Sequence, residues 1–348
     1  MRQLENFSSE LNALLAPDIP PMSNQVIICI WRRHDDDDDL AGGAGGAPGG
    51  GDGGDGGGVP AGGEADGGEQ PAAAEGGRDE PCAVTVAGLD LNHGDLAGEF
   101  PEELGLLSDL AVLHLNSNRF CGTLPESLPK LSLLHELDVS NNRLSGGFPQ
   151  HILCLPNVKY VDIRFNNFCG AVPPAIFDKK IDALFLNDNH FDFELPDNFG
   201  NSPASVIVLA NVNLRGCIPS SIGRMGATLN ELIVLNSGVR SCIPPEVGHL
   251  GGLTVLDLSF NQLQGALPES MAWMRSLEQL DVAHNELAAY NSFCGDPERC
   301  LGLRRVDDRQ NCIAGRPDQR PADQCLAFLH RPPVHCDAHG CFAPPGHY

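Results

Sequence analysis

One dense group of potential metal ligands lies in the run HCDAHGC near the C-terminus. His335, Cys336, His339 and Cys341 fall within seven residues, whereas structural zinc sites usually space two ligand pairs across a longer loop. We therefore favour a disulfide at this point over a metal site. The run Asp35 to Asp39 is interpreted as solvated charge, because it lacks the glycine turn of an EF-hand.

Catalytic motifs give no competing signal. The sequence contains no GxSxG nucleophile elbow, HExxH helix, P-loop or kinase signature, and no GxGxxG turn outside the glycine-rich run 41–77. Each of these motifs places a nucleophile, metal or phosphate in a defined turn. We expect a protein that is not an enzyme and that carries no cofactor and no metal.

Charge and cysteine usage narrow the class of partner. The chain has 46 acidic and 22 basic residues, a net charge of −24, which disfavours nucleic acid and favours basic ligands. Thirteen cysteines without a CxxC pair indicate an oxidising, extracellular compartment. No signal peptide is visible at the N-terminus, and Val26 to Trp31 is too short for a membrane span. We favour a start that is not the natural one over unconventional export.

A repeat dominates the rest of the chain. The template LxxLxLxxNxLxGxIP recurs from residues 86, 110, 134, 158, 181, 204, 229, 253 and 277, at spacings of 23 to 25 residues. In each LxL segment alternate side chains of a short strand point inward, so Leu113 and Leu115 should stack on their counterparts in the next coil. The pattern predicts an α/β leucine-rich repeat solenoid with 24-residue repeats, a curved parallel sheet, and 3₁₀ or short helices on the outer side.

The asparagine of the template should lie inside each turn, where its amide can bond backbone groups of neighbouring coils. Coils one, six and seven carry other residues at this position, so we expect their turns to be looser or differently bonded. The regular positions are Asn118, Asn142, Asn166, Asn189, Asn261 and Asn285, and the departures are Gly94, Val212 and Ser237.

These boundaries predict three regions. Residues 1–80 form an acidic, glycine-rich tail that we expect to be disordered. Whether this tail belongs to the natural protein stays open. Residues 81–290 form the repeat domain of about nine coils, with one further coil lost after Leu287. Residues 291–348 form a cysteine-rich cap and tail. The one glycosylation sequon, Asn6-Phe7-Ser8, lies in the tail.

Longer strings carry a closer resemblance. LDLNHGDLAGEFPEELGLLSDLAVLHLNSNRFCG from residue 89, PDNFGNSPASVIVLANVNLRGCIPSSIG from residue 196 and DDRQNCIAGRPDQRPADQCLAFLHRPPVHC from residue 307 resemble the plant leucine-rich repeat extensins, including pollen extensin-like forms. The similarity covers roughly residues 82–336, without the family's extensin arm. It implies a secreted cell-wall or apoplast protein that binds small basic cysteine-rich peptides of the rapid alkalinisation factor type. It further implies a role in cell-wall assembly and polar growth, with cell-wall polymers as further partners. Dimerisation stays open.

Outward side chains of the strands should form the concave binding face. An apolar centre there is flanked by acids, which would steer a basic, partly apolar peptide. Two alternative interpretations stay open. The acidic tail covers this apolar stripe, or the stripe is an exposed surface that has no partner. The predicted peptide-binding residues are Asp90, His114, Asp138, Asp162, Phe185, Val208, Ala210, Ile233, Leu235, Asp257 and Asp281.

Cysteine positions predict disulfides. Cys217 and Cys242 share a register in adjacent coils about 4.8 Å apart, so we expect them to bond, with two free thiols as the alternative. Cys121 and Cys169 lie two coils apart and should be buried thiols. In the cap, Cys300 with Cys312 and Cys325 with Cys336 are candidate pairs, although the sequence does not fix the connectivity.

Three other functions compete with peptide binding. A polygalacturonase-type enzyme inhibitor shares the LxGxIP coil. A receptor ectodomain fragment would need a membrane span, and none follows residue 336. The family usually carries a cysteine-paired helical cap before the first coil. Its absence here, with the missing coil and extensin arm, also fits a truncated, nonfunctional gene product.

Overall fold

The computed structural model describes residues 27–32, 84–290, 303–330, 337, 341 and 342. The chain divides into two compact units, of which the one from Val86 onward contains the repeats and the other spans Ile30–Thr85. Strand β1 spans Ile27–Arg32. The charge run at Asp35 to Asp39 and the sequon at Asn6 lie outside the described residues.

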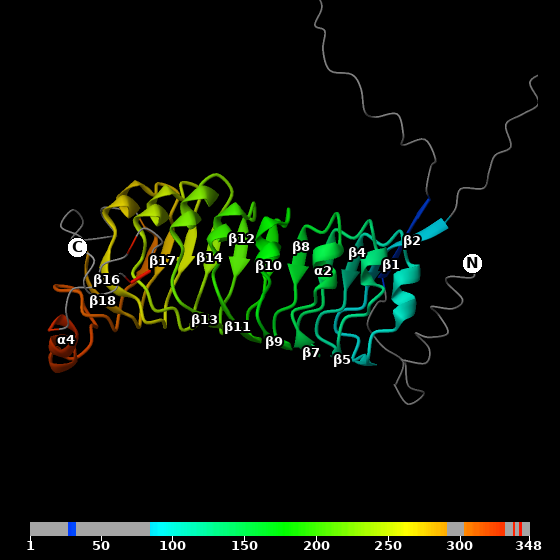
Figure 1. The fold of residues 1–348 in the computed structure, drawn as a ribbon, viewed down its shortest axis with the longest axis horizontal. Coiled ribbons are helices and arrows are strands. Elements are labelled where there is room, and N and C mark those ends of the chain that lie inside the picture. The colour runs from blue at the N-terminus through cyan, green and yellow to red at the C-terminus, as the bar shows by residue number, and fades with distance from the viewer. Residues whose placement is uncertain (1–26, 33–83, 291–302, 331–336, 338–340, 343–348) are drawn as a thin grey trace, which may run out of the picture. The chain divides into compact units, whose positions relative to one another are not determined.

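The repeat unit is a stack of coils joined by a long parallel sheet (Figure 1). Each coil contributes one short strand whose central residue points into the core, as the LxL pattern predicted. The strands are, in spatial order, β2 (Val84–Asp90), β4 (Val112–His114), β6 (Glu136–Asp138), β8 (Tyr160–Asp162), β10 (Ala183–Phe185), β12 (Val206–Val208), β14 (Glu231–Ile233), β15 (Val255–Asp257), β17 (Gln279–Asp281) and β19 (Arg305–Asp307).

A second set of parallel strands follows the turns, as the GxIP element predicted. One sheet contains β3 (Ala97–Gly98), β5 (Arg119–Gly122), β7 (Arg143–Gly147), β9 (Asn167–Gly170), β11 (His190–Glu194) and β13 (Asn213–Arg215). A separate pair contains β16 (Gln264–Leu267) and β18 (Glu286–Tyr290).

Short helical segments close each coil on the side away from the long sheet. Several begin directly after the proline of GxIP, whose fixed φ suits a helix start. They are η2 (Glu102–Leu106), η3 (Leu128–Lys130), α2 (His151–Cys154), η4 (Pro174–Asp178), η5 (Asp197–Asn201), η6 (Ser220–Met225), η7 (Pro245–His249) and η8 (Glu269–Trp273).

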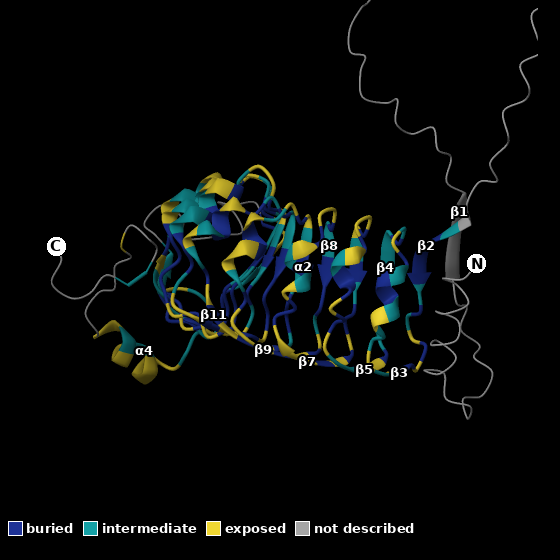
Figure 2. Cartoon of the chain, turned by 45° about the vertical axis from the view of Figure 1, so that its right-hand side comes forward, coloured by how far each residue is buried: buried dark blue, intermediate teal, exposed yellow. Residues whose placement is uncertain are grey.

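The core runs through the stack without a break. Leu113, Leu137, Leu184 and Leu256 are each at most 1% exposed and occupy equivalent positions in their coils. Figure 2 shows the buried residues along the inner side of the coils and the exposed ones on the turns. Because each coil buries its leucines only against its neighbours, the coils stabilise one another in series.

The asparagine ladder is confirmed. Asn118 donates through Nδ2 to the carbonyl of Leu91 in the preceding coil at 2.9 Å, and its Oδ1 accepts the N–H of Leu96 at 2.9 Å. Asn142, Asn166, Asn189, Asn261 and Asn285 bond in the same manner. Ser237, one of the predicted departures, is differently bonded, since its hydroxyl donates to the carbonyls of Leu209 and Leu235.

The stack continues beyond the expected boundary at residue 290. Strand β19 pairs with β17, and Asn311 donates to the carbonyl of Val282 like the other ladder asparagines. This coil escaped the template because Asp308 stands where a core leucine belongs. Asp308 is 3% exposed, and its carboxylate accepts hydrogen bonds from Arg316 Nε at 2.6 Å and Tyr290 Oη at 2.7 Å.

The segment after β19 is tied to the last coils. Arg320 donates to the carbonyls of Asn285 and Gln310 at 3.0 Å each, and helix α4 (Ala322–Leu329) follows. None of the residues of α4 is buried, and Figure 2 shows it mainly exposed. This arrangement agrees with a cap that is anchored through its arginine.

Candidate functional site

Nine of the eleven residues predicted to line the ligand face lie in one row across the long sheet, and Ala210 and Leu235 follow two residues after Val208 and Ile233. The strand registers place His114 beside Asp138, Asp162 beside Phe185, and Ile233 beside Asp257. We call the outward side of the long sheet the open face. Its central row contains Asp90, His114, Asp138, Asp162, Phe185, Val208, Ile233, Asp257 and Asp281, and Asp307 of β19 extends it.

The apolar centre of the open face is narrower than the sequence suggested. Val208 is 9% and Ala210 is 6% exposed, so both are largely covered. Phe185, Ile233 and Leu235 are half-buried and supply the accessible apolar surface. A ligand would therefore contact the centre mainly through these three side chains.

The aspartates of the central row have a structural role that the sequence reasoning missed. Each accepts, through Oδ1, the backbone N–H of the residue two positions later, which holds the chain as it leaves the strand. The bond lengths are 2.9 Å for Asp138 and Asp257, 3.1 Å for Asp90, Asp162 and Asp281, and 3.2 Å for Asp307. The spacing Asp-x-polar after each strand was the signal that could have indicated it.

Two of these carboxyls lie in surroundings that oppose ionisation. Burial, reinforced by the Asp138 carboxyl, raises the pKa of Asp162 to about 6. Burial also raises the pKa of Asp281 to about 6, with Asp257 and Asp307 adding repulsion and Arg305 opposing it. The negative charge of the open face therefore increases between pH 4 and 7.

This shift predicts a pH-dependent stability. Asp281 is protonated more readily in the folded state than in the unfolded state, so the free energy of unfolding falls as pH rises from about 4 to about 6. We expect Asp281→Asn, whose Oδ1 still accepts the Ala283 N–H, to be more stable than the parent at pH 7 by about 1 kcal/mol, because solvent screens this half-buried carboxyl. Below pH 4 this advantage should vanish. Urea unfolding at pH 4, 5, 6 and 7 measures it, and a difference that is constant with pH would contradict the assignment.

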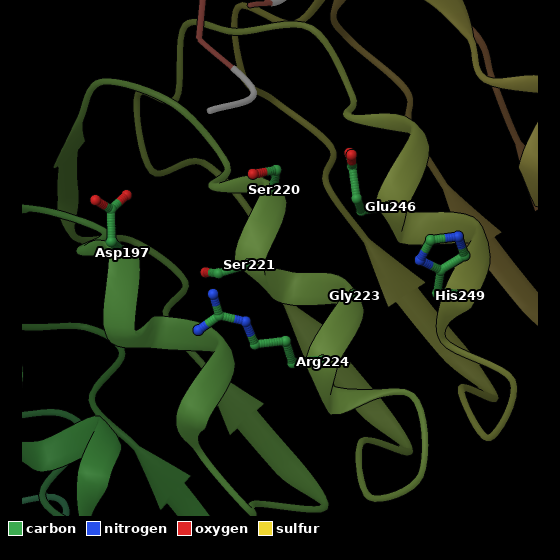
Figure 3. Close-up of a pocket in the computed structure, with 7 residues that line it drawn as sticks. All are labelled: Asp197, Ser220, Ser221, Gly223, Arg224, Glu246 and His249. Carbon is green, nitrogen blue, oxygen red and sulfur yellow. The ribbon is translucent and has the colours of Figure 1, made fainter. Parts of the chain in front are cut away.

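A polar pocket of about 520 Å³ lies on the opposite, helical side of the coils. Figure 3 shows its lining from three successive helical segments, with Asp197 from η5, Arg224 from η6, and Glu246 and His249 from η7. Arg224 donates to Asn201 Oδ1 at 3.1 Å. Within the described residues no group of three or more His, Cys, Asp or Glu side chains is arranged to hold a metal ion.

Comparison with known proteins decides the family. A family model described as Leucine Rich Repeat matches residues 109–131, 133–155 and 252–274. Leucine-rich repeat extensin-like protein 6 of Arabidopsis thaliana is 51% identical over 285 residues, covering 76% of this chain and 60% of the relative. Leucine-rich repeat extensin-like protein 7 is 48% identical over 291 residues, covering 77% of this chain and 67% of the relative. The chain belongs to the leucine-rich repeat extensin family.

The chain spans only part of several members of this leucine-rich repeat extensin family, for example 36% of Leucine-rich repeat extensin-like protein 3. Solved structures of similar fold include two plant receptors. The plant peptide hormone receptor RGFR1 in complex with RGF2 gives a TM-score of 0.58 at 25% identity, covering 70% of this chain and 43% of the receptor. The GASSHO1/SCHENGEN3 ectodomain of Arabidopsis thaliana, in complex with CASPARIAN STRIP INTEGRITY FACTOR 2, gives 0.61 at 25% identity, covering 68% and 31%.

The disulfides of this leucine-rich repeat extensin chain differ from the predicted pairs. Cys217 bonds to Cys341, with Cα atoms 5.0 Å apart, so the predicted bond from Cys217 to Cys242 is wrong. Cys242 takes part in a disulfide of its own. Because the sequence distance between Cys217 and Cys341 is 124 residues, coil register gave no indication of this pair. Cys341 lies in the run HCDAHGC, so its bond agrees with the disulfide favoured there.

Cap pairing also differs from the prediction. Cys312 bonds to Cys325, with Cα atoms 5.3 Å apart, whereas we expected them to pair with Cys300 and Cys336, which lie outside the described residues. Cys121 and Cys169 are free thiols as predicted. They are not buried, however, because Cys121 is half-buried and Cys169 is exposed on β9.

No helix in the described part of the chain is long and apolar enough to span a bilayer.

Proposed function

We propose that this chain is a non-enzymatic extracellular module whose open face binds a secreted basic peptide of the rapid alkalinisation factor type. Through that peptide the protein would influence cell-wall assembly and polar cell growth. The proposal includes the cell wall or apoplast as its location and cell-wall polymers as further partners.

The observation that supports it most is the pattern of the open face. Half-buried Phe185, Ile233 and Leu235 lie between the carboxyls of Asp138 and Asp162 on one side and Asp257 and Asp281 on the other. Apolar anchors supply most of the binding energy of an interface, while surrounding charges steer a complementary ligand. A basic peptide with an apolar segment matches this order of groups.

The similar structures support the same kind of partner. The two receptors are, by their descriptions, a peptide hormone receptor with RGF2 and an ectodomain with CASPARIAN STRIP INTEGRITY FACTOR 2. Their fold extends over about two thirds of this chain. The extensin-like relatives belong to the same family. That this chain shares the activities of these whole proteins is part of the proposal.

Calorimetric titration tests the proposal. The oxidised full chain, secreted from a eukaryotic host, is titrated with a panel of basic rapid alkalinisation factor peptides. We expect Phe185→Asp with Ile233→Asp to weaken binding at least 30-fold, about 2 kcal/mol, because two anchors are replaced by charge. Trp273→Asp on η8, where the side chain is 68% exposed, is the matched control and should bind like the parent.

Two results would contradict the proposal. Absence of binding to every peptide by a folded, oxidised chain would remove peptide recognition and direct attention to pectinase inhibition or to a nonfunctional product. Equal affinity of the double variant and the parent would place the peptide elsewhere than on the open face.

A further inference from the structure

One group of side chains on the open face already holds a cation. The carboxylate of Asp162 is fully buried, and Oδ2 lies 3.1 Å from Nε of Arg164, whose side chain is 36% exposed. The guanidinium carbon of Arg164 lies 5.0 Å from the centre of the Phe185 ring. A carboxylate and an aromatic face are the groups that proteins use to recognise guanidinium and ammonium ions.

Tyr160 completes the enclosure. Its hydroxyl donates to Asp162 Oδ2 at 3.3 Å, and its ring lies 5.5 Å from that of Phe185. Burial, with the Asp162 charge adding to it, raises the pKa of Tyr160 to about 12, so the phenol stays neutral. The two rings and the carboxylate come from the adjacent strands β8 and β10, which are packed rigidly by the leucine core beneath them.

The equivalent aspartates differ in what they hold: Asp307 of β19 accepts a hydrogen bond from Arg309 Nε at 2.9 Å, whereas two others bind no basic side chain among the described residues. Asp138 and Asp257 each bond through Oδ1 to the hydroxyl and the N–H of a serine two residues later. In the outward rows from β2 to β17, Arg164 is the one arginine or lysine. The fold does not require this side chain for the turn, because the bond to Asp162 Oδ1 comes from the backbone N–H of Arg164 at 3.1 Å.

We infer that Tyr160, Asp162 and Phe185 form a subsite for a basic side chain of the bound peptide, and that Arg164 occupies this subsite until the peptide displaces it. The inference rests on the proposed function for the identity of the ligand. Phe185 lies beside Val208 of the next strand, so a basic residue in the subsite would be followed by ligand residues on the apolar centre.

Displacement has a thermodynamic consequence. In the parent chain the incoming cation gains only the contacts that Arg164 loses, so the exchange contributes little to the binding free energy of the peptide. In a chain whose subsite is empty, the same contacts would contribute in full. The apparent affinity of the parent is reduced by the fraction of molecules whose subsite is closed. Removal of the internal cation should therefore increase the affinity for a basic peptide.

The first experiment needs no peptide. In Arg164→Ala the buried carboxylate has lost its partner, and we expect millimolar methylguanidinium to raise the unfolding temperature saturably, by several degrees at pH 7.5. Methylurea, which has nearly the same shape without charge, should have no such effect, and the parent chain should respond to neither. Asp162→Asn with Arg164→Ala should also be unresponsive. A folded Arg164→Ala protein that ignores methylguanidinium would overturn the subsite.

The second experiment measures the competition. We expect Arg164→Ala to bind the tightest peptide of the calorimetric panel about tenfold more strongly than the parent does. Arg143→Ala on β7 changes the net charge equally away from the open face and controls for long-range attraction. Weaker binding by Arg164→Ala than by the parent would show that Arg164 assists the ligand and would overturn the displacement. If neither protein binds a peptide while methylguanidinium still stabilises Arg164→Ala, the proposed function fails and the cation subsite stands.

Discussion

Replacing Gly200 by alanine is expected to destabilise the repeat unit by about 3 kcal/mol, because the added methyl group would overlap the backbone carbonyl of Ser221 in the next coil. Gly200 is the fourth of the five residues of η5 and is buried against η6. The obstructing atoms belong to backbone that is held by its own coil, so neither side can move without opening the stack.

Thermal and urea unfolding followed by circular dichroism measure the effect. Gly251→Ala is the matched control, since a Cβ at Gly251 would have no atom within 4 Å, and it should unfold like the parent. Equal stability of the two variants would show that the helical segments of adjacent coils pack more loosely than described.

Replacing Asn142 by alanine is expected to cost a comparable amount, about 3 kcal/mol. The amide donates to the carbonyls of Leu115, Val139 and Ser140 at 2.9 to 3.1 Å, and its Oδ1 accepts the N–H of Phe120 at 3.0 Å. Alanine would leave these buried groups of two coils without a partner, and each such group costs about 1 to 3 kcal/mol.

Two further substitutions make this prediction specific. Asn142→Ser should lose less stability than Asn142→Ala, because Ser237 at the equivalent position bonds two carbonyls through its hydroxyl. Asn157→Ala should be nearly neutral, since Asn157 is exposed and makes one hydrogen bond, to the carbonyl of Ser132. If the alanine and serine variants at residue 142 unfold alike, the ladder does not act through hydrogen bonding.

The repeat could be predicted because its period is fixed by geometry. Once Leu113 and Leu115 are assigned to the core, parallel pairing in constant register places every central-row residue, from Asp90 to Asp281. The coil around Asp308 could not be predicted by the same reasoning, because a buried carboxylate is tolerated there only through Arg316 and Tyr290, whose positions depend on tertiary structure.

Long-range features were also out of reach. The partner of Cys217 depends on the path of the C-terminal segment, which no local pattern encodes. The pairing of Arg164 with Asp162 was equally unpredictable, because it depends on the distance from the Arg164 guanidinium to the Phe185 ring on the next strand. The sequence predicted which side chains point outward, but not which of them are already engaged with one another.

The disulfide between Cys217 and Cys341 gives the solenoid a mechanical polarity. Under tension applied at the two chain ends, coils that contact only their neighbours would peel away one at a time, each releasing about 80 Å of chain for about 24 residues. The covalent link bypasses the segment between the two cysteines, which are separated by 124 positions in sequence, and this segment would bear no load. Stretching would therefore unravel the coils that precede Cys217, while those that contain Ile233, Asp257 and Asp281 keep their shape.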